Sequence, residues 1–342
     1  MSTHTGLDTR DTAGTRVARD AGQDGTGILD RDAPFYVAGH RGLIGSAIWR
    51  RLERAGFTHL IGVPSSDLNL LDRTAVEDFF AEHQPRHVAL AAAKVGGIQA
   101  NNDFPVDFLS ENLRIQGNVM DSAVRHRVHK LLFLGSSCIY PRFAPQPIPE
   151  DALLTGKLEV TNDAYAVAKI AGIQYVKAVR RQYGLPWISA MPSNLYGPGD
   201  NFRPGVSHVL PALIMRYRQA RDDGAATVTN WGTGTPLREF LYADDCADAC
   251  LFLLDNYDGG RHLNVGTGAE ISIKDLAALI ADVVGYEGET VWDASKPDGT
   301  PRKMMDVSRL SGLGWRARTG LREGVERTVR WLESHEEEAR TA

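Results

Sequence analysis

Tyr165 and Lys169 are the two residues whose types and spacing are best suited to proton chemistry. They are four positions apart, and a helix would place both side chains on one face. A tyrosine hydroxyl titrates at about 10 in model peptides, and a neighbouring ammonium favours its ionised form, so the pair could exchange a proton with a carbonyl oxygen near neutral pH. The same spacing is more common as a buried tyrosine beside a surface lysine, so the interpretation depends on the rest of the chain.

A second reactive stretch, Gly135-Ser136-Ser137-Cys138, follows the apolar segment Lys130–Leu134. We expect this segment to be a strand, and ligands of open α/β sheets bind at the carboxyl ends of strands. Ser136 or Ser137 could therefore donate a hydrogen bond to a substrate carbonyl. Cys138 could act as a base or nucleophile if its pKa is lowered; the alternative, a small buried core residue, stays open.

A glycine-rich turn lies after the predicted strand Phe35–Ala38, and residues 46–55 beyond it have the apolar spacing of a helix. Glycines let a pyrophosphate approach the backbone, and the free N–H groups of the following helix attract its charge. The strand, turn and helix together predict a dinucleotide site, although the spacing G-x-x-G-x-x-G differs from the more common G-x-G-x-x-G. The residues of the turn are Gly39, His40, Arg41, Gly42, Leu43, Ile44 and Gly45.

The residues after the second predicted strand, 59–63, indicate which dinucleotide binds. NAD enzymes usually place an acidic residue there for the adenosine ribose, whereas this strand runs into Pro64, Ser65 and Ser66. Arg41 in the glycine turn could face a 2′-phosphate, and both serines could donate hydrogen bonds to it. We therefore expect NADP(H) as the cofactor; a surface arginine beside a polar turn is the alternative.

The remaining candidates follow later strands or begin helices. His208 begins the predicted helix 208–220, whose dipole disfavours a charged imidazole. Arg216 and Arg238 could bind phosphates, and Trp231 offers a flat face to a base or sugar. The polar loop 296–303 could serve as a lid over the substrate. The turn 192–198 after the predicted strand 187–191 could cover a nicotinamide, and it includes Pro192, Ser193, Asn194 and Leu195.

Predicted strands and helices alternate from residue 34 to about 192, which is typical of a parallel sheet covered on both faces. We expect an α/β fold, a Rossmann-type doubly wound parallel sheet with a smaller C-terminal α/β substrate domain. Residues 32–202, with part of 237–268 returning, would form the NADP-binding domain, and residues 203–342 mainly the substrate domain. Residues 1–31 contain almost no large apolar side chain, so we expect a disordered extension.

The composition excludes several other classes of protein. A net charge of −5 without runs of lysine and arginine argues against nucleic acid as a partner, and no apolar run is long enough to span a membrane. Three cysteines point to a reducing compartment, which for this chain means the cytoplasm. Cys246 and Cys250 lack further ligands for a metal site, so we expect no metal and assign both to the core.

Taken together, the glycine turn, the Tyr165–Lys169 pair and the segments 194–197 and 238–245 resemble the extended short-chain dehydrogenase/reductase superfamily. Within it, the segments 91–97, 134–141, 200–208 and 296–303 resemble the GDP-L-fucose synthase family. The likeness spans nearly the whole chain beyond the N-terminal extension. That family epimerises C3 and C5 of GDP-4-keto-6-deoxy-D-mannose and then reduces C4 with NADPH, and the resemblance also implies a homodimer.

The resemblance implies a role for each matching residue. Cys138 would take protons from C3 and C5, and His208 would return protons on the opposite face. Ser136 and Tyr165 would polarise the C4 carbonyl. Lys169 would lower the pKa of Tyr165, the final proton donor, and would bind the nicotinamide ribose. Cofactor contacts are implied for residues 39–45, Leu134, Gly135, Ser136, Ser137, residues 192–195, Lys169 and His208, and contacts to the GDP-sugar for Arg216, Trp231, Arg238 and Asp298. Ser65 departs from the family, which places an arginine there for the 2′-phosphate.

Two other functions remain alternatives. A related nucleotide-sugar 4-epimerase or 4,6-dehydratase is the first, although such a dehydratase usually carries Thr-Asp-Glu where this chain has residues 136–138. A catalytically silent NADP-binding protein is the second, and the intact pair of Tyr165 and Lys169 argues against it.

Overall fold

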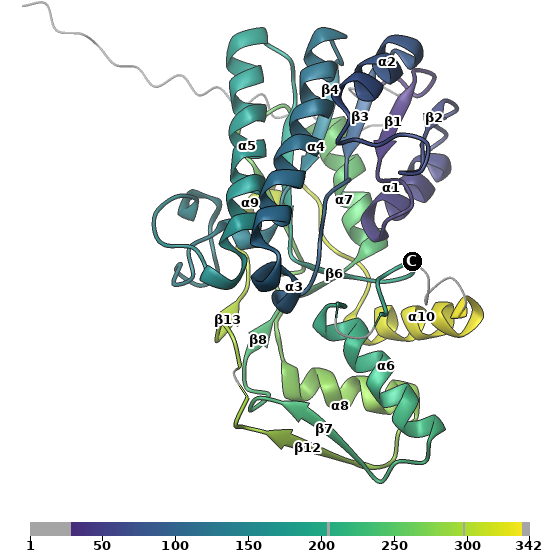
Figure 1. Cartoon of the computed structure of the whole chain (residues 1–342), viewed down its shortest axis with the longest axis vertical. Helices are drawn as coiled ribbons and strands as arrows, with labels where there is room; N and C mark the ends of the chain where they lie inside the picture. The colour runs from purple at the N-terminus through teal and green to yellow at the C-terminus, as the bar shows by residue number, and fades with distance from the viewer. Residues whose placement is uncertain (1–28, 204–205, 297, 337–342) are drawn as a thin grey trace, which may run out of the picture.

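A six-stranded parallel sheet forms the centre of the larger part of the molecule (Figure 1). The computed structural model describes residues 29–203, 206–296 and 298–336. The strand order is β10-β5-β4-β3-β1-β2, and every neighbouring pair is parallel. This arrangement confirms the predicted fold class. The strands are β1 (Phe35–Ala38), β2 (Leu60–Ile61), β3 (His87–Leu90), β4 (Lys130–Leu134), β5 (Ile188–Pro192) and β10 (Leu263–Val265).

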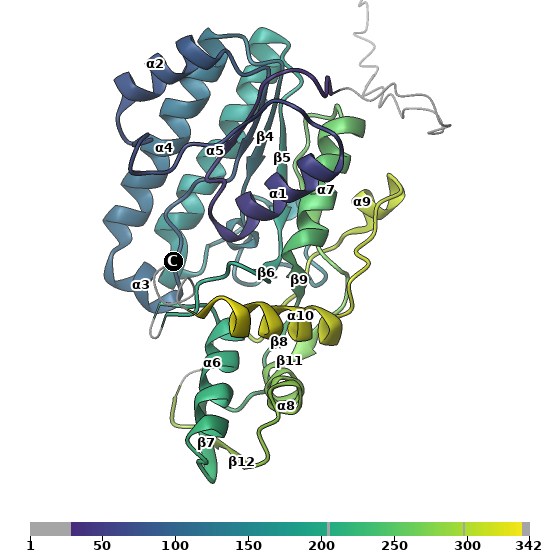
Figure 2. The ribbon, with the colours of Figure 1, turned by 90° about the vertical axis from the view of Figure 1, so that its right-hand side faces the viewer.

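Helices cover both faces of this sheet (Figure 2). On one face, α1 (Leu43–Arg54) and α7 (Ala243–Asn256) enclose a core that includes Leu52 and the fully buried Cys246 and Cys250. The placement of both cysteines in the core confirms their prediction. The opposite face has a second core, formed with α2 (Arg73–His83), α4 (Pro105–Arg125) and α5 (Asp163–Tyr183).

A third core lies in the C-terminal part, among α6 (Val209–Asp222), α8 (Ile273–Val284) and α10 (Leu321–Ser334). Three small sheets surround it, with the strand orders β11-β8-β13, β12-β7 and β6-β9. Within the described ranges, no helix is long and apolar enough to cross a membrane. The remaining elements are α3 (Ile98–Asp103), α9 (Ser308–Gly312), η1 (Ser137–Ile139), η2 (Glu150–Ala152), η3 (Val160–Asn162), β6 (Asn194–Tyr196), β7 (Thr227–Trp231), β8 (Leu237–Arg238), β9 (Phe240–Tyr242), β11 (Ile271–Ser272), β12 (Glu289–Asp293) and β13 (Arg302–Lys303).

The structure corrects the predicted N-terminal extension and one helix start. The chain is already packed at Leu29, which is 6% exposed in the first core and whose N–H donates to Asp255 Oδ1 at 3.2 Å. An extension ending at residue 31 is therefore too long, because this single leucine provides an apolar anchor; residues 1–28 lie outside the described chain. Helix α1 begins at Leu43 rather than residue 46, since Gly42 is already its N-cap.

Candidate functional site

The strand order brings the predicted site residues to one edge of the central sheet. β2 and β3 lie on opposite sides of β1, so the chain changes direction there, and ligands of such sheets bind beside this point at the carboxyl ends of the strands. Gly39 follows β1, Gly135 follows β4 and Ser193 follows β5. Segments distant in sequence therefore meet at one site.

The glycine turn has the geometry that a dinucleotide phosphate requires. Gly39 has φ +84°, and a Cβ there would lie 2.8 Å from the backbone nitrogen of Ala92, so only glycine fits. Within the described part of the chain, no side chain caps the N-terminus of α1 at Gly42, which leaves its first N–H groups available to an anion. Leu43 and Ile44 lie in the first turn of α1 and pack against the core, so they can offer only backbone groups.

A cavity beside the turn suits the adenosine end of NADP. Its volume is about 400 Å³, and it combines the turn with the segment after β2. Arg41 and both serines of that segment share it, so a cation and two hydroxyl donors stand beside an uncapped helix N-terminus. These groups fit a phosphate on the ribose. The cavity is lined by Gly39, His40, Arg41, Gly42, Val63, Pro64, Ser65 and Ser66.

Tyr165 and Lys169 lie on one face of α5, but their electrostatics differ from the prediction. Lys169 Nζ donates to the carbonyl of Leu134 at 2.9 Å and lies 5.7 Å from the centroid of the Tyr165 ring. Burial lowers the pKa of Lys169 to about 8. Burial, followed by the charge of Cys138, raises the pKa of Tyr165 above its ordinary value. Burial therefore dominates the pKa of Tyr165, so the phenol stays protonated and can donate, and the lowering effect of Lys169 remains a prediction.

Cys138 is 6% exposed and lies in the short helix η1, directly after β4. Burial raises the pKa of its thiol, while the charge of Lys303, a hydrogen bond with Ser136 and the charge of Lys169 act in the opposite direction. From the sequence, we expect Cys138 to act as a base or nucleophile if its pKa is lowered, and this condition is not met. The structure does place the thiol within electrostatic reach of both Tyr165 and Lys169.

His208 is the N-cap residue of α6, so the helix begins at Val209, one position after the predicted start. Its pKa lies below the ordinary value, as predicted, but the first cause is burial and the second is the charge of Lys303. The same ammonium acts on Cys138 and on Arg238. Lys303 is the residue that sequence reasoning missed: its only signal was a place at the end of the predicted lid, and nothing local shows which side chains it meets.

Among the residues predicted to cover the nicotinamide, Asn194 makes a hydrogen bond within the protein. Its side-chain amide donates to the carbonyl of Glu239 at 2.7 Å and thereby joins β6 to β9, so these donors are not directed at a nicotinamide. The hydroxyl of Ser193 is buried and has no hydrogen-bond partner among the described residues. It therefore remains available to a ligand. Pro192 ends β5, and Leu195 packs against the first core.

The predicted GDP-sugar residues lie in the C-terminal part and form a second cluster around the end of β7. Arg216 donates to the buried Asn230 Oδ1 at 2.6 Å, whereas the following residue, Trp231, exposes its ring on the other face of β7. Asp298 accepts from the N–H and hydroxyl of Thr233 at 2.7 and 2.8 Å. In the predicted lid, Lys296 Nζ lies 5.6 Å from the centroid of the Trp231 ring, and residue 297 lies outside the described ranges.

Position 232, between Trp231 and Thr233, requires a glycine. Gly232 has φ +80°, and a Cβ there would lie 2.3 Å from Asp298 Oδ1, so this carboxylate can approach the turn only because residue 232 has no side chain. Arg238 lies opposite Lys303 in the pairing of β8 with β13, and a Cβ at Gly299, the residue after Asp298, would lie 3.8 Å from its Nη2. Burial lowers the pKa of Arg238.

Comparisons with known proteins agree with this geometry. Residues 35–266 match the model of the NAD dependent epimerase/dehydratase family. The chain is 56% identical to GDP-L-fucose synthase 1 of Arabidopsis thaliana, over 92% of this chain and 98% of that protein, and 51% identical to GDP-L-fucose synthase of Escherichia coli K12, over 87% and 95%. A crystal structure of a GDP-L-fucose synthetase from Naegleria fowleri bound to NADP is similar, with TM-score 0.84, 28% identity and coverage of 92% of this chain and 98% of that one.

Proposed function

The chain belongs to the NAD dependent epimerase/dehydratase family, and we propose that it has the activity of a GDP-L-fucose synthase. It converts GDP-4-keto-6-deoxy-D-mannose to GDP-L-fucose by epimerising C3 and C5 and reducing C4. The observation that carries this proposal is the position of Cys138 within electrostatic reach of the Tyr165–Lys169 pair. A thiol beside a phenol and an ammonium adds proton transfer at carbon to a site that is otherwise typical of a reductase.

The first step is proton abstraction next to the C4 ketone. Ser136 and Tyr165 donate hydrogen bonds to the ketone oxygen, so charge that moves onto this oxygen is stabilised. Cys138 takes the proton from C3 or C5, and the electron pair of the broken C–H bond moves to the C4 oxygen as an enolate. His208, whose resting imidazole is neutral, takes up a proton from solvent when the anionic substrate binds and donates it to the same carbon on the opposite face, which inverts its configuration.

The second step is reduction of the same carbonyl. NADPH, when bound, supplies a hydride to C4. Tyr165 donates its proton to the oxygen, which its raised pKa supports because the phenol stays protonated at neutral pH. Lys169 keeps a positive charge near the phenol below pH about 8 and thereby favours transfer of the phenolic proton. One ketone therefore serves both reactions.

We propose that NADPH is held by the glycine turn and the segment after β2. The uncapped N-terminus of α1 would face the pyrophosphate, and Arg41 and Ser65 the 2′-phosphate. The family arginine at position 65 is absent, and Arg41 compensates by supplying a cation from the other side of the same cavity. Ser193, with its unpartnered hydroxyl, would contact the nicotinamide half. We also propose that Arg216, Trp231, Arg238 and Asp298 bind the GDP-sugar.

We propose the domain division, the homodimer and the cytoplasmic location as well. Residues 32–202 with part of 237–268 bind NADP, and 203–342 mainly the substrate; the return of β10 to the central sheet and the separate third core support this division.

Exposed Val106 and Leu113 on α4 and Val167 on α5 suit a face between two copies; a monomer mass in light scattering would contradict the dimer. The buried free cysteines suit a reducing cytoplasm.

The test is incubation of the purified protein with GDP-4-keto-6-deoxy-D-mannose and NADPH, followed by determination of product stereochemistry by NMR. We expect GDP-L-fucose with one NADPH oxidised per sugar. A 4-reduced sugar that keeps the original configuration at C3 and C5 would contradict the epimerase part. Absence of NADPH oxidation would contradict the whole proposal and favour a catalytically silent binding protein.

A further inference from the structure

Lys303 is a cation without a partner of its own inside the site. It lies in β13, which pairs with β8 in parallel register so that Lys303 is opposite Arg238. Among the described residues, the ammonium of Lys303 makes no hydrogen bond or ion pair. The acid whose charge reaches it is Glu159, and that carboxylate already pairs with Arg142 at 3.2 Å. Arg238 donates to the carbonyl of Leu237 and also has no ion pair within the described ranges. Two adjacent cations without a paired carboxylate indicate that the site is built for negative charge.

The charged groups around Lys303 identify where that negative charge forms. They come from four separate elements, and the groups that face the ammonium are Cys138, His208, Arg238 and Glu159. Cys138 is the one among them that can become a new anion, since Glu159 is already paired. The thiol is itself faced by Lys303, Ser136, Lys169 and Tyr165, and the charge of Lys303 opposes its burial most strongly.

The backbone that carries Lys303 is held firmly against the loop after β4. The N–H of Met304 donates to Gln146 Oε1 at 3.0 Å, and its carbonyl accepts from the N–H of Ile148 at 2.8 Å. The next residue, Met305, donates its N–H to the buried carboxylate of Glu239 at 3.1 Å. These contacts leave little freedom for the position of the neighbouring Lys303.

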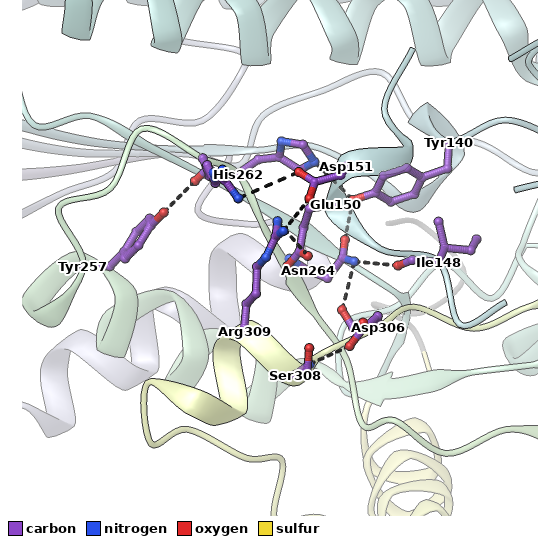
Figure 3. A network of polar contacts seen from close by, with 11 residues as sticks. Tyr140, Ile148, Glu150, Asp151, Tyr257, His262, Asn264, Asp306, Ser308 and Arg309 are labelled. Carbon is purple, nitrogen blue, oxygen red and sulfur yellow. Dashed lines mark hydrogen bonds and ion pairs between the residues drawn. The ribbon is translucent and has the colours of Figure 1, made fainter. Parts of the chain in front are cut away.

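A buried asparagine connects this segment to the loop that carries Cys138 (Figure 3). Asn264 Oδ1 accepts from the hydroxyl of Tyr140, two residues after Cys138, at 2.5 Å. Asn264 Nδ2 donates to the carbonyl of Asp306, three residues after Lys303, at 3.0 Å. One side chain therefore fixes the two segments whose reactive groups face each other.

We propose that Lys303 is a positioning residue whose ammonium stabilises the thiolate of Cys138. When the thiol releases its proton to solvent water, the ion pair that results holds the sulfur ready to accept a proton from carbon. This proposal rests on the proposed function for the use of the thiolate, but the ion pair itself forms without substrate or cofactor. The alternative role for Lys303, an anchor for the diphosphate of the substrate, would leave the thiol unaffected.

The experiment measures thiolate formation in the full-length protein, with neither substrate nor cofactor added. Ultraviolet absorbance of the thiolate is followed from neutral to alkaline pH, and the signal of a Cys138→Ser variant is subtracted to isolate residue 138. We expect Lys303→Met to move the midpoint upward by about one pH unit or more, because it removes the charge that most strongly opposes the effect of burial on the thiol. Lys303→Arg restores the midpoint, and Lys296→Met, at an exposed position in the same loop, leaves it unchanged.

Superimposable titrations of the unmutated protein and Lys303→Met would overturn the proposal, as would a variant that raises only the KM for the GDP-sugar. Circular dichroism checks that the variants are folded, and Lys303→Gln replaces Lys303→Met if the latter is not. Because the titration requires no turnover, its failure is distinguishable from failure of the proposed function, which the product analysis decides.

Discussion

Asn264→Ala tests whether the connection between the two reactive segments is as strong as its contacts indicate. The side chain of Asn264 is fully buried and makes three hydrogen bonds, to the Tyr140 hydroxyl and to the carbonyls of Ile148 and Asp306. Alanine removes all three. The Tyr140 hydroxyl keeps His262 at 3.2 Å, and the Ile148 carbonyl keeps the N–H of Asp306, whereas the Asp306 carbonyl loses its hydrogen-bond partner.

The magnitude follows from these contacts. Three hydrogen bonds at about 1 kcal/mol each, and about 1 kcal/mol for the carbonyl left unpaired, predict a loss of about 4 kcal/mol in the free energy of unfolding. Globular proteins gain about 2 cal/mol/K of entropy per residue on unfolding, so 342 residues correspond to about 0.7 kcal/mol/K. The expected fall in Tm is therefore about 6 °C.

The assay is differential scanning calorimetry, with Asn256→Ala as the matched control. Asn256 also donates one hydrogen bond to a carbonyl, that of Phe252 at 2.9 Å, but it is exposed at the end of α7. We expect its replacement to lower Tm by less than about 2 °C. If the Tm of both variants falls by the same small amount, the buried network does not hold the two segments together. A fixed distance between Lys303 and Cys138 is then no longer supported.

Three further predictions concern the cofactor, the substrate and pH. Arg41→Ala should reduce the preference for NADPH over NADH in kcat/KM by about tenfold or more, since it removes a charged contact to the 2′-phosphate; equal efficiency with both cofactors in the unmutated protein would refute the assignment. Gly232→Ala should raise the KM for the GDP-sugar without changing the Kd of NADPH, because its Cβ would displace the Asp298 carboxylate; an unchanged KM would remove Asp298 from the site. The rate of C4 reduction should fall as pH rises through about 8, where Lys169 loses its proton. Between pH about 8 and 10.5, by contrast, Lys169 makes the free energy of unfolding rise with pH. Its folded pKa of about 8 lies below the ordinary 10.5, so the unfolded chain binds more protons between these values and stability rises with pH; Lys169→Met should lack this rise in thermal unfolding.

Much of the fold could be predicted because its signals are local. The apolar runs of β1 and β4 match the predicted bounds, 35–38 and 130–134, without change. Shorter elements were missed or shifted: β2 is only two residues long, where a strand over 59–63 was predicted, and the short helix α3 was not predicted. Such elements depend on their neighbours for stability, and their sequences carry little pattern of their own.

The residues of the site could be predicted from the sequence, but their pKa shifts could not. Tyr165 was found from its spacing to Lys169, Cys138 from its place after a strand and His208 from its place at a helix start, which are local features. The pKa directions of these side chains depend on burial, which is a property of the whole fold, so the raised pKa of Tyr165 could not be predicted. Lys303 was missed for the same reason, since it meets Cys138 only through the pairing of β13 with β8.

The most direct test of the central claim is deuterium incorporation during turnover of GDP-4-keto-6-deoxy-D-mannose with NADPH in D₂O. We expect the unmutated protein to give a product with solvent deuterium at both C3 and C5. Cys138→Ser should reduce exchange at both carbons by about a hundredfold or more, the usual contribution of a general base, while reduction at C4 persists. Unchanged exchange at C3 and C5 in this variant would contradict the account, because the proton-transfer groups would then lie elsewhere.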